Sequence, residues 1–303
     1  MSKRCLAAAV LLLASCASAP ELAITIDDLP VHSPYPPGTT PLEVSQEMIA
    51  ALKSGGVPAT TFVNGVNAKD GPTMEALEDW RDAGFILGNH SWSHRHLNEM
   101  SVDEFETELT RNEPLLERLG GNSDWRWFRY PFLDEGKDEA QRIEARRVLQ
   151  RRGYRVADVT MSFSDWQFTP AYARCVAAGD KQAIAELERM YMEVAEKNIP
   201  VARETARKLY GRDIPFVLLM HVSAMSAHMM PEVIELYRKS GFRFVTLSKA
   251  ESDPAYRSDI DLSAERLSQW DLAKAKGVDL PLPPDPSAKL AAMCPGGPTV
   301  TNP

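Results

Sequence analysis

The chain has 303 residues, 44% of them hydrophobic and 25% charged, and a formal net charge of −8 at pH 7. This length suits one large domain or two small ones, and the apolar content is sufficient for a buried core. The negative charge argues against nucleic acid and anionic lipid as partners, because both attract basic surfaces.

The first residues resemble an export signal. Lys3 and Arg4 precede the apolar run Leu6–Leu13, which is too short to span a bilayer, and small residues follow it. Leu13–Cys16 further resembles a bacterial lipobox, in which the cysteine is lipidated and becomes the mature N-terminus. Cleavage after Ala19 is the alternative. We therefore expect residues 1–19 to be a signal peptide and the mature protein to work in the periplasm or cell envelope. Its expected contact with the membrane is a lipid on Cys16.

Strand-like runs alternate with helical segments along most of the chain. The runs lie near residues 22–26, 59–63, 85–88, 125–128, 154–161, 216–220 and 242–246. Glycines precede them where helices should end, and Ser101 with Glu104 forms a capping box that opens a helix reaching Leu119. This alternation predicts parallel strands joined by right-handed crossovers. It fits an open doubly wound sheet as well as a barrel.

Two of the runs end in residues that suit a metal ion. The first ends in Asp27 and Asp28, and the third is followed by His90 and His94. On a first helical turn, imidazoles four residues apart project from one face and can bind one divalent cation at about 2 Å. Two histidines leave the ion short of ligands, and the paired carboxylates are the best source of a third. The alternative is that the histidines are ordinary surface residues and the aspartates cap a helix.

Three later runs also end in polar residues. Arg129–Phe132 follows the run near 125–128, Asp165 and Trp166 follow the run near 154–161, and His221 follows the run near 216–220. Residues at the carboxyl ends of five different strands converge if the sheet closes. We therefore predict an incomplete (β/α) barrel rather than an open sheet.

The five motifs Thr25–Asp28, His90–His94, Arg129–Phe132, Ser164–Trp166 and Leu218–His221 resemble, in order, those of the polysaccharide deacetylases with a NodB homology domain. These proteins are carbohydrate esterase family 4. The resemblance covers residues 22–247 and implies an incomplete or distorted (β/α)7 barrel of the NodB type. One position departs from it: the family's fourth motif usually reads Asp-x-x-Asp-Trp, and here Ser162 stands at the first Asp.

The resemblance also implies a mechanism of metal-dependent amide hydrolysis. Asp28, His90 and His94 are the expected ligands of one divalent ion, for which zinc is the first choice and cobalt or another late transition metal the alternative. Asp27 takes the family's role of general base. Arg129 is expected to orient Asp27, because a guanidinium binds a carboxylate through two parallel bonds.

The remaining expected roles concern the leaving group and the acyl group. His221 is expected to protonate the departing nitrogen, with Asp165 raising its pKa. The backbone N–H of Tyr130 is the expected donor to the oxyanion. Trp166 and Leu219 are expected to wall a small pocket for the acetyl methyl.

Two segments fall outside the regular alternation. Residues 169–212 are too long for one crossover helix, so we expect a helical insertion over the barrel. We expect the deacetylase domain to span residues 20–250 and a Pro-rich C-terminal extension to span 251–303, with a short helix near Leu262–Lys276. Cys175 and Cys294 are the two thiols left in the mature domain, and an oxidising compartment favours a disulfide between them.

Two further histidines lie near the motifs. His32 lies in a Pro-rich loop directly after the aspartates, where it could touch substrate, although a solvated loop histidine is the expectation. His96 is expected to point away from the ligands, because it lies two residues beyond His94 on the predicted helix.

These residues predict an enzyme that removes acetyl groups from an N-acetylated glycan or oligosaccharide outside the cytoplasm. A hydrolase of a small amide, an imide or an O-acetyl ester fits the same residues. The shape of the site distinguishes them, since exposed aromatics along a groove favour a polymer and a closed pocket favours a small molecule. A non-catalytic sugar-binding protein is a third possibility, against which the intact Asp27 and His221 argue.

Overall fold

A curled sheet of parallel strands forms the centre of the molecule. The computed structural model describes residues 19–69, 71–121, 123–256, 262 and 269–295. The sheet runs in the order β5-β4-β3-β2-β1-β6, and β7 pairs with the start of β1. Its strands are β1 Glu21–Leu29, β2 Thr60–Val63, β3 Ile86–Asn89, β4 Trp127–Phe128, β5 Arg155–Val156, β6 Phe216–His221 and β7 Arg243–Phe244.

The sheet curls without closing into a complete barrel. Within the described part of the chain, β5 and β6 share no ladder, and a single bridge between Met161 and Leu218 crosses the seam. The predicted strand 154–161 is shorter than expected because its backbone changes partner. The Ala157 N–H donates to Phe128 of β4, whereas the Met161 N–H donates to Val217 of β6. The predicted incomplete barrel is therefore confirmed.

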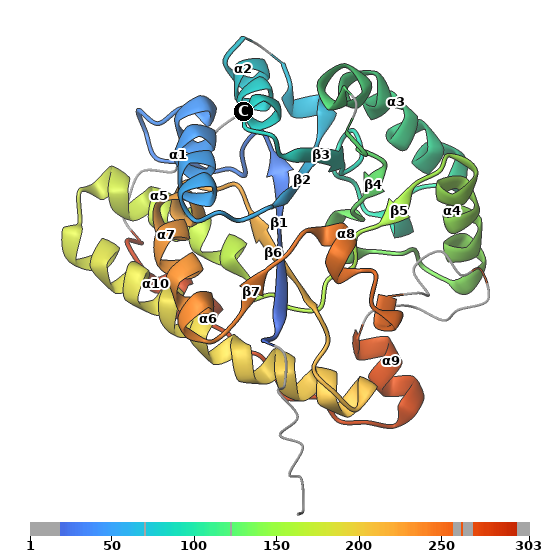
Figure 1. Ribbon diagram of the computed structural model, residues 1–303. Coiled ribbons are helices and arrows are strands. Elements are labelled where there is room, and N and C mark those ends of the chain that lie inside the picture. Colours follow the sequence, from blue (N-terminus) through green and yellow to red (C-terminus); the bar gives the residue numbers. More distant parts are fainter. Residues whose placement is uncertain (1–18, 70, 122, 257–261, 263–268, 296–303) are drawn as a thin grey trace, which may run out of the picture.

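Helices cover the outer face of the sheet, and β1 runs through the middle of the molecule (Figure 1). They are α1 Pro41–Ser54, α2 Gly71–Asp82, α3 Val102–Gly120, α4 Glu139–Arg151, α7 Ala224–Lys239 and α8 Leu247–Ala250. The predicted capping box opens α3, since the Ser101 hydroxyl accepts from the Glu104 N–H and the Glu104 carboxylate accepts from the Ser101 N–H. Burial of β1 from Leu22 to Leu29 places the core around this strand.

Short 3₁₀ turns connect several elements, and two of them contribute to the site described below. They are η1 Gly65–Asn67, η2 Leu97–Glu99, η3 Pro131–Leu133, η4 Asp165–Gln167 and η5 Pro254–Tyr256.

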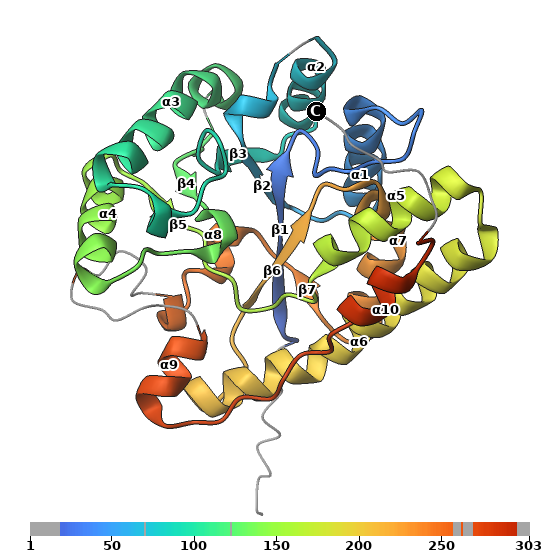
Figure 2. The same ribbon diagram turned by 180° about the vertical axis from the view of Figure 1, so that it is seen from behind.

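The predicted helical insertion consists of α5 Phe168–Ala178 and the 30-residue helix α6 Lys181–Tyr210. Figure 2 shows α6 crossing one side of the molecule, with α9 near its end and α10 beside α5. The expected C-terminal helix is seen as α9 Gln269–Lys276, whereas 263–268 lie outside the described residues. A last helix, α10, spans Ser287–Ala292.

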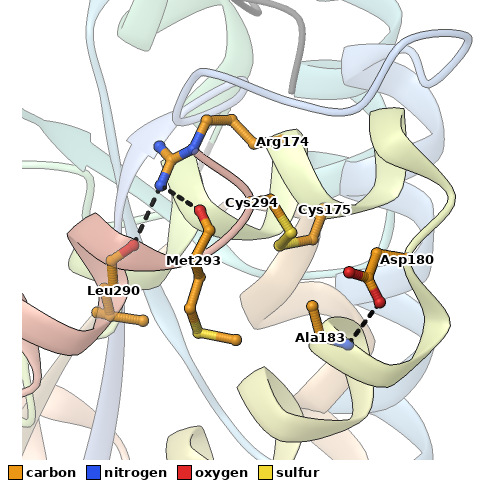
Figure 3. Close-up of a disulfide and its surroundings, with 7 residues drawn as sticks. All are labelled: Arg174, Cys175, Asp180, Ala183, Leu290, Met293 and Cys294. Atoms are coloured by element: carbon orange, nitrogen blue, oxygen red, sulfur yellow. Dashed lines mark hydrogen bonds between the residues drawn. A yellow bond between two sulfur atoms is a disulfide. The ribbon is translucent and has the colours of Figure 1, made fainter. Parts of the chain in front are cut away.

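A disulfide attaches the C-terminal segment to the insertion, as predicted. Cys175 of α5 and Cys294 are bonded, with their Cα atoms 5.4 Å apart (Figure 3). Arg174 supports the same attachment, because its guanidinium donates to the carbonyls of Leu290 and Met293, each at 3.1 Å. The tail is thus held to α5 by one covalent bond and two hydrogen bonds.

The proposed export signal and Cys16 lie outside the described residues. Within the described ranges, no helix combines the length and apolar character needed to cross a bilayer.

Replacing Cys175 and Cys294 together by serine should lower the free energy of unfolding by roughly 2–5 kcal/mol, because the bond closes a long loop in the unfolded chain. The two residues are 119 positions apart. Chemical denaturation of the protein and the double variant measures the difference. A reducing agent should lower the stability of the parent protein and leave that of the double variant unchanged. Equal stability of the two oxidised proteins would contradict this expectation.

Candidate active site

The carboxyl end of β1 places two aspartates over the barrel. β1 pairs with β6 in a continuous register that ends with Asp27 opposite His221. Successive side chains of a strand normally point to opposite faces, which would separate Asp27 from Asp28. Asp28 instead has φ 69°, and both carboxylates approach His90 Nε2, Asp27 Oδ2 at 3.6 Å and Asp28 Oδ1 at 3.4 Å. The irregular backbone thus brings both carboxylates to one site.

Strained backbone is concentrated around this site. Left-handed φ angles cost a non-glycine residue on the order of 1–3 kcal/mol each, and such residues tend to cluster where function requires them. Seven non-glycine residues of the described chain have positive φ, and only Cys294 belongs to another region. Of the other six, Asp28 lies at the carboxyl end of β1, and the remaining five lie in the segments that follow β3, β4 and β5: Ser91, His94, Phe132, Leu133 and Ser164.

Asp28, His90 and His94 form the candidate metal site. One possible ligand atom from each lies within 4.8 Å of the others. The Nε2 atoms of both histidines are 3.4 Å from Asp28 Oδ1. This cluster is the one that the spacing of the motifs predicted.

The prediction that a helical turn brings His90 and His94 together was wrong. Residues 90–96 form no helix in the structure. His90 and His94 meet through a loop in which Ser91 and His94 both have positive φ, and their ring centroids lie 4.8 Å apart. The His94 N–H donates to the Ser91 hydroxyl at 3.1 Å, which holds the loop closed. The spacing therefore serves a tight loop rather than a helical turn.

The chemistry of this cluster fits a divalent cation. His90 Nδ1 lies 2.8 Å from the Arg129 carbonyl, which can only accept a hydrogen bond, so Nδ1 carries the proton and Nε2 a lone pair. That lone pair faces Asp28 Oδ1, which is buried and has no hydrogen-bond partner. Burial lowers the pKa of His90 and of His94 to about 4, so both rings are neutral at pH 7. Lone pairs facing a carboxylate repel it unless a cation lies between them.

Asp27 lies beside this cluster, against Arg129. Arg129 Nη1 is 3.4 and 3.3 Å from the two Asp27 carboxylate oxygens. The same guanidinium, which is fully buried, donates to the Ala157 carbonyl and the Thr25 hydroxyl. Burial raises the pKa of Asp27 to about 6, and the Arg129 charge opposes part of that rise. Asp27 is therefore a carboxylate whose proton affinity suits a base near neutral pH.

His221 and the fully buried Asp165 form a pair at the end of β6. His221 Nδ1 is 2.9 Å from Asp165 Oδ1, while the His221 N–H and the Ser226 hydroxyl both donate to Asp165 Oδ2 at 2.8 Å. Burial by itself would lower the pKa of His221, but the charge and hydrogen bond of Asp165 raise it to about 9. His221 is therefore protonated at neutral pH.

The sequence did not predict the contacts that two further histidines, His32 and His96, make near the site. His32 was expected to be solvated, yet its Nδ1 lies 2.6 Å from Asp28 Oδ2 and its ring centroid 5.0 Å from that of His221. His96, which was expected to point away from the ligands, stacks on Phe132 at 3.7 Å between ring centroids, a contact that the sequence did not predict. Phe132, left without a role, is 56% exposed and also contacts the edge of His94. The composition of the motifs gave no indication of these contacts, because they depend on the loop conformations.

The other predicted site residues take different positions. The Tyr130 side chain is buried with its hydroxyl unpartnered, and the predicted role of the Tyr130 backbone N–H stays a prediction. Trp166 is 47% exposed on η4, whereas Leu219 is buried in β6, and their shared pocket stays a prediction. Ser162, the departure from the family pattern, accepts a hydrogen bond from the Ser164 N–H at 3.3 Å.

A cavity of about 260 Å³ adjoins the site at the open seam of the barrel. Arg129, Tyr130, Ser162 and Ser164 contribute to its wall, and so do Leu280, Pro281 and Pro283 of the C-terminal segment. A cavity therefore lies next to the site at the seam between β5 and β6, and residues of the C-terminal segment form part of its wall.

Comparison with known proteins agrees with the resemblance seen in the motifs. Residues 14–157 match the family model of polysaccharide deacetylases. Over 101 residues the chain is 32% identical to a peptidoglycan-N-acetylglucosamine deacetylase of Bacillus cereus, a match that covers 33% of this chain and 32% of that protein. The chain therefore spans about a third of the length of this curated relative. The resemblance to polysaccharide deacetylases, predicted from five motifs, is confirmed.

Solved structures show the same fold. The chitin deacetylase of Colletotrichum lindemuthianum superposes with a TM-score of 0.53 and 18% identity, covering 78% of this chain and 88% of that one. A pseudoenzyme of carbohydrate esterase family 4 from Bacillus anthracis gives a TM-score of 0.53 at 17% identity, covering 77% and 65%. The last two motifs lie beyond residue 157, so the contact between Asp165 and His221 rests on the structure of this chain and not on the matched segment.

Replacing His90 and His94 together by alanine should remove most of a bound divalent ion, because two of three ligands are lost. Elemental analysis of the purified protein measures the ion per chain. His228→Ala is a matched control, since His228 is an exposed histidine paired with Glu188 away from the cluster. Loss of less than half of the ion in the double variant would exclude this site.

Proposed function

We propose that the protein is a metal-dependent N-deacetylase that removes acetyl groups from an N-acetylated glycan. The observation that carries this proposal is the convergence of a neutral two-histidine, one-carboxylate cluster, a buried base and a protonated histidine at one rim. Amide hydrolysis needs an activated water, a polarised carbonyl and a proton for the leaving amine. The site contains residues suited to each requirement.

The residues divide these tasks by their environments. Asp28, His90 and His94 would hold zinc or another late transition metal, which when bound lowers the pKa of water and polarises an acyl oxygen. Asp27 accepts the proton of the attacking water, and Arg129 holds its carboxylate in place. His221 donates a proton to the departing amine. The Tyr130 N–H has no protein acceptor among the described residues and is available to the oxyanion.

The pseudoenzyme relative makes the completeness of the site important. A fold of this family does not by itself imply catalysis. In this chain Asp27 and His221 accompany all three candidate ligands, and their partners Arg129 and Asp165 are buried beside them. The complete set supports an enzyme over a sugar-binding protein on the same scaffold.

The exposed rim favours a glycan over a small amide, imide or ester. Phe132 and Trp166 present large apolar surfaces beside the site, and Leu133 adds a third. Aromatic faces exposed at a binding site suit the apolar faces of sugar rings. The relatives named for peptidoglycan and chitin agree with this class of substrate.

The proposed cellular location rests on the N-terminal sequence. We infer export to the periplasm or cell envelope with a lipid on Cys16, supported by the lipobox-like Leu13–Cys16. Glu21 begins β1 and Asp28 lies near its end, so an anchor would hold the rim opposite the site toward the membrane. Mass spectrometry of the mature N-terminus tests the anchor, and an unmodified start at Pro20 would exclude it.

Acetate release from N-acetylated oligosaccharides is the direct test of the proposed function. Purified protein loaded with zinc should release acetate from oligomers of N-acetylglucosamine or from peptidoglycan fragments. A parallel assay with O-acetylated sugars and small N-acetyl amides separates the competing substrates. Sugar binding without acetate release would support the non-catalytic alternative.

Asp27→Asn should retain the metal ion and lower activity by a factor of about 10² or more, since it removes the general base without changing its size. Elemental analysis and an acetate assay on the same preparation measure both quantities. Near-normal activity with a full complement of metal would mean that another group accepts the proton.

Activity should fall as pH rises through about 9, because His221 must be protonated to act as the acid and its pKa is raised to about 9. In Asp165→Asn the raising charge is lost, so this alkaline limb should move to lower pH by roughly 1–3 units. The pH dependence of kcat/KM reports this limb in the free enzyme. Glu188→Gln, which alters the exposed His228 pair, serves as control, and an unmoved limb in Asp165→Asn would reassign the acid.

A further inference from the structure

His32 makes a direct contact with a candidate metal ligand. Its Nδ1 lies 2.6 Å from Asp28 Oδ2, in the range of strong hydrogen bonds to a carboxylate. The family motifs assign no function to this loop. Carboxylate oxygens accept hydrogen bonds, so Nδ1 is the donor.

The two oxygens of Asp28 therefore have different partners. Oδ2 is taken by His32, whereas Oδ1 faces His90 Nε2 and His94 Nε2 at 3.4 Å and has no hydrogen-bond partner. A free carboxylate can bind a cation through either oxygen or through both. The His32 contact leaves a single oxygen for the ion.

The loop that carries His32 is itself held in place. The His32 N–H donates to the Val222 carbonyl at 2.7 Å, and the Val222 N–H donates to the Asp27 carbonyl at 3.2 Å. Val222 follows His221 directly and is buried. The backbone of His32 is thus held by the residue that follows β6, and its ring reaches a carboxylate at the end of β1.

The backbone of Asp28 needs such a support. Its φ of 69° is unfavourable for a residue with a side chain, so the surroundings must maintain this conformation. Among the described contacts of its carboxylate, the His32 hydrogen bond is the shortest.

We propose that His32 is a positioning residue that holds Asp28 as a one-oxygen ligand of the metal ion. This role rests on the proposed metal site but not on the proposed substrate. The alternative is that His32 is itself a fourth ligand. Its Nδ1 points at Asp28 Oδ2, not at the cluster formed by Oδ1 and the two imidazoles, which favours the positioning role.

Three variants separate these roles. His32→Ala and His32→Leu both remove the donor, and the second keeps more of the side-chain volume. His32→Asn keeps an N–H at the position of Nδ1, yet its amide is a poor ligand for a late transition metal. His228→Ala is the matched control for loss of an exposed histidine.

The experiment measures cobalt(II) affinity of the full chain by competition with a chelator, without any substrate. Losing the hydrogen bond should raise the dissociation constant about 10–100-fold in His32→Ala and His32→Leu, as for other partners of metal ligands. His32→Asn should recover most of the affinity. Visible absorption of the cobalt-loaded Asn variant should match that of the parent protein, because the ligand set is unchanged. Thermal unfolding of the metal-free proteins shows whether each variant folds.

Two results would overturn the proposal. Parent-like affinity in both donor-free variants would mean that His32 does not position Asp28. Affinity as low in His32→Asn as in His32→Ala, with an altered cobalt spectrum, would identify His32 as a ligand. Neither result depends on acetate release, so failure of the proposed substrate class is distinguishable from failure of this proposal.

Discussion

The register between β1 and β6 is the constraint on which the site depends. The two strands pair without interruption from Leu22 with Phe216 to Asp27 with His221. This ladder is buried in the core, so the register is fixed by packing as well as by hydrogen bonds. It places the proposed base and the proposed acid on neighbouring strands at the same height. A shift by one residue would turn Asp27 away from the barrel and separate it from Arg129.

Two adjacent carboxylates have different chemistry because their surroundings differ. Asp27 is buried beside the Arg129 guanidinium, and burial raises the pKa of Asp27 to about 6. Burial would raise the pKa of Asp28 too, but the His32 hydrogen bond and the electrostatic effect of the surrounding histidines together outweigh burial and hold that pKa well below the usual range. Environments that separate the pKa values of paired carboxylates commonly assign one to proton transfer and the other to charge. The positive φ of Asp28 lets both serve one site.

The sequence was sufficient to predict the barrel because five polar motifs follow five apolar runs, and the carboxyl ends of parallel strands meet. It also predicted the disulfide, since few thiols remained to choose from. It could not predict that β5 would end at Val156, where the backbone changes partner from β4 to β6. The contacts of His32 with Asp28 and of His96 with Phe132 were missed for a similar reason. Both histidines lie in loops with positive φ nearby, and hydrophobic periodicity carries no information about such conformations.

The central claim is that Asp28 is reserved for the metal ion and Asp27 for the proton. A crystal structure of the zinc-loaded protein, with anomalous diffraction to locate the metal, tests it most directly. We expect one ion about 2.0–2.2 Å from Asp28 Oδ1, His90 Nε2 and His94 Nε2, with Asp27 outside its ligand shell. An ion bound through the Asp27 carboxylate, or no ion at this cluster, would contradict the account.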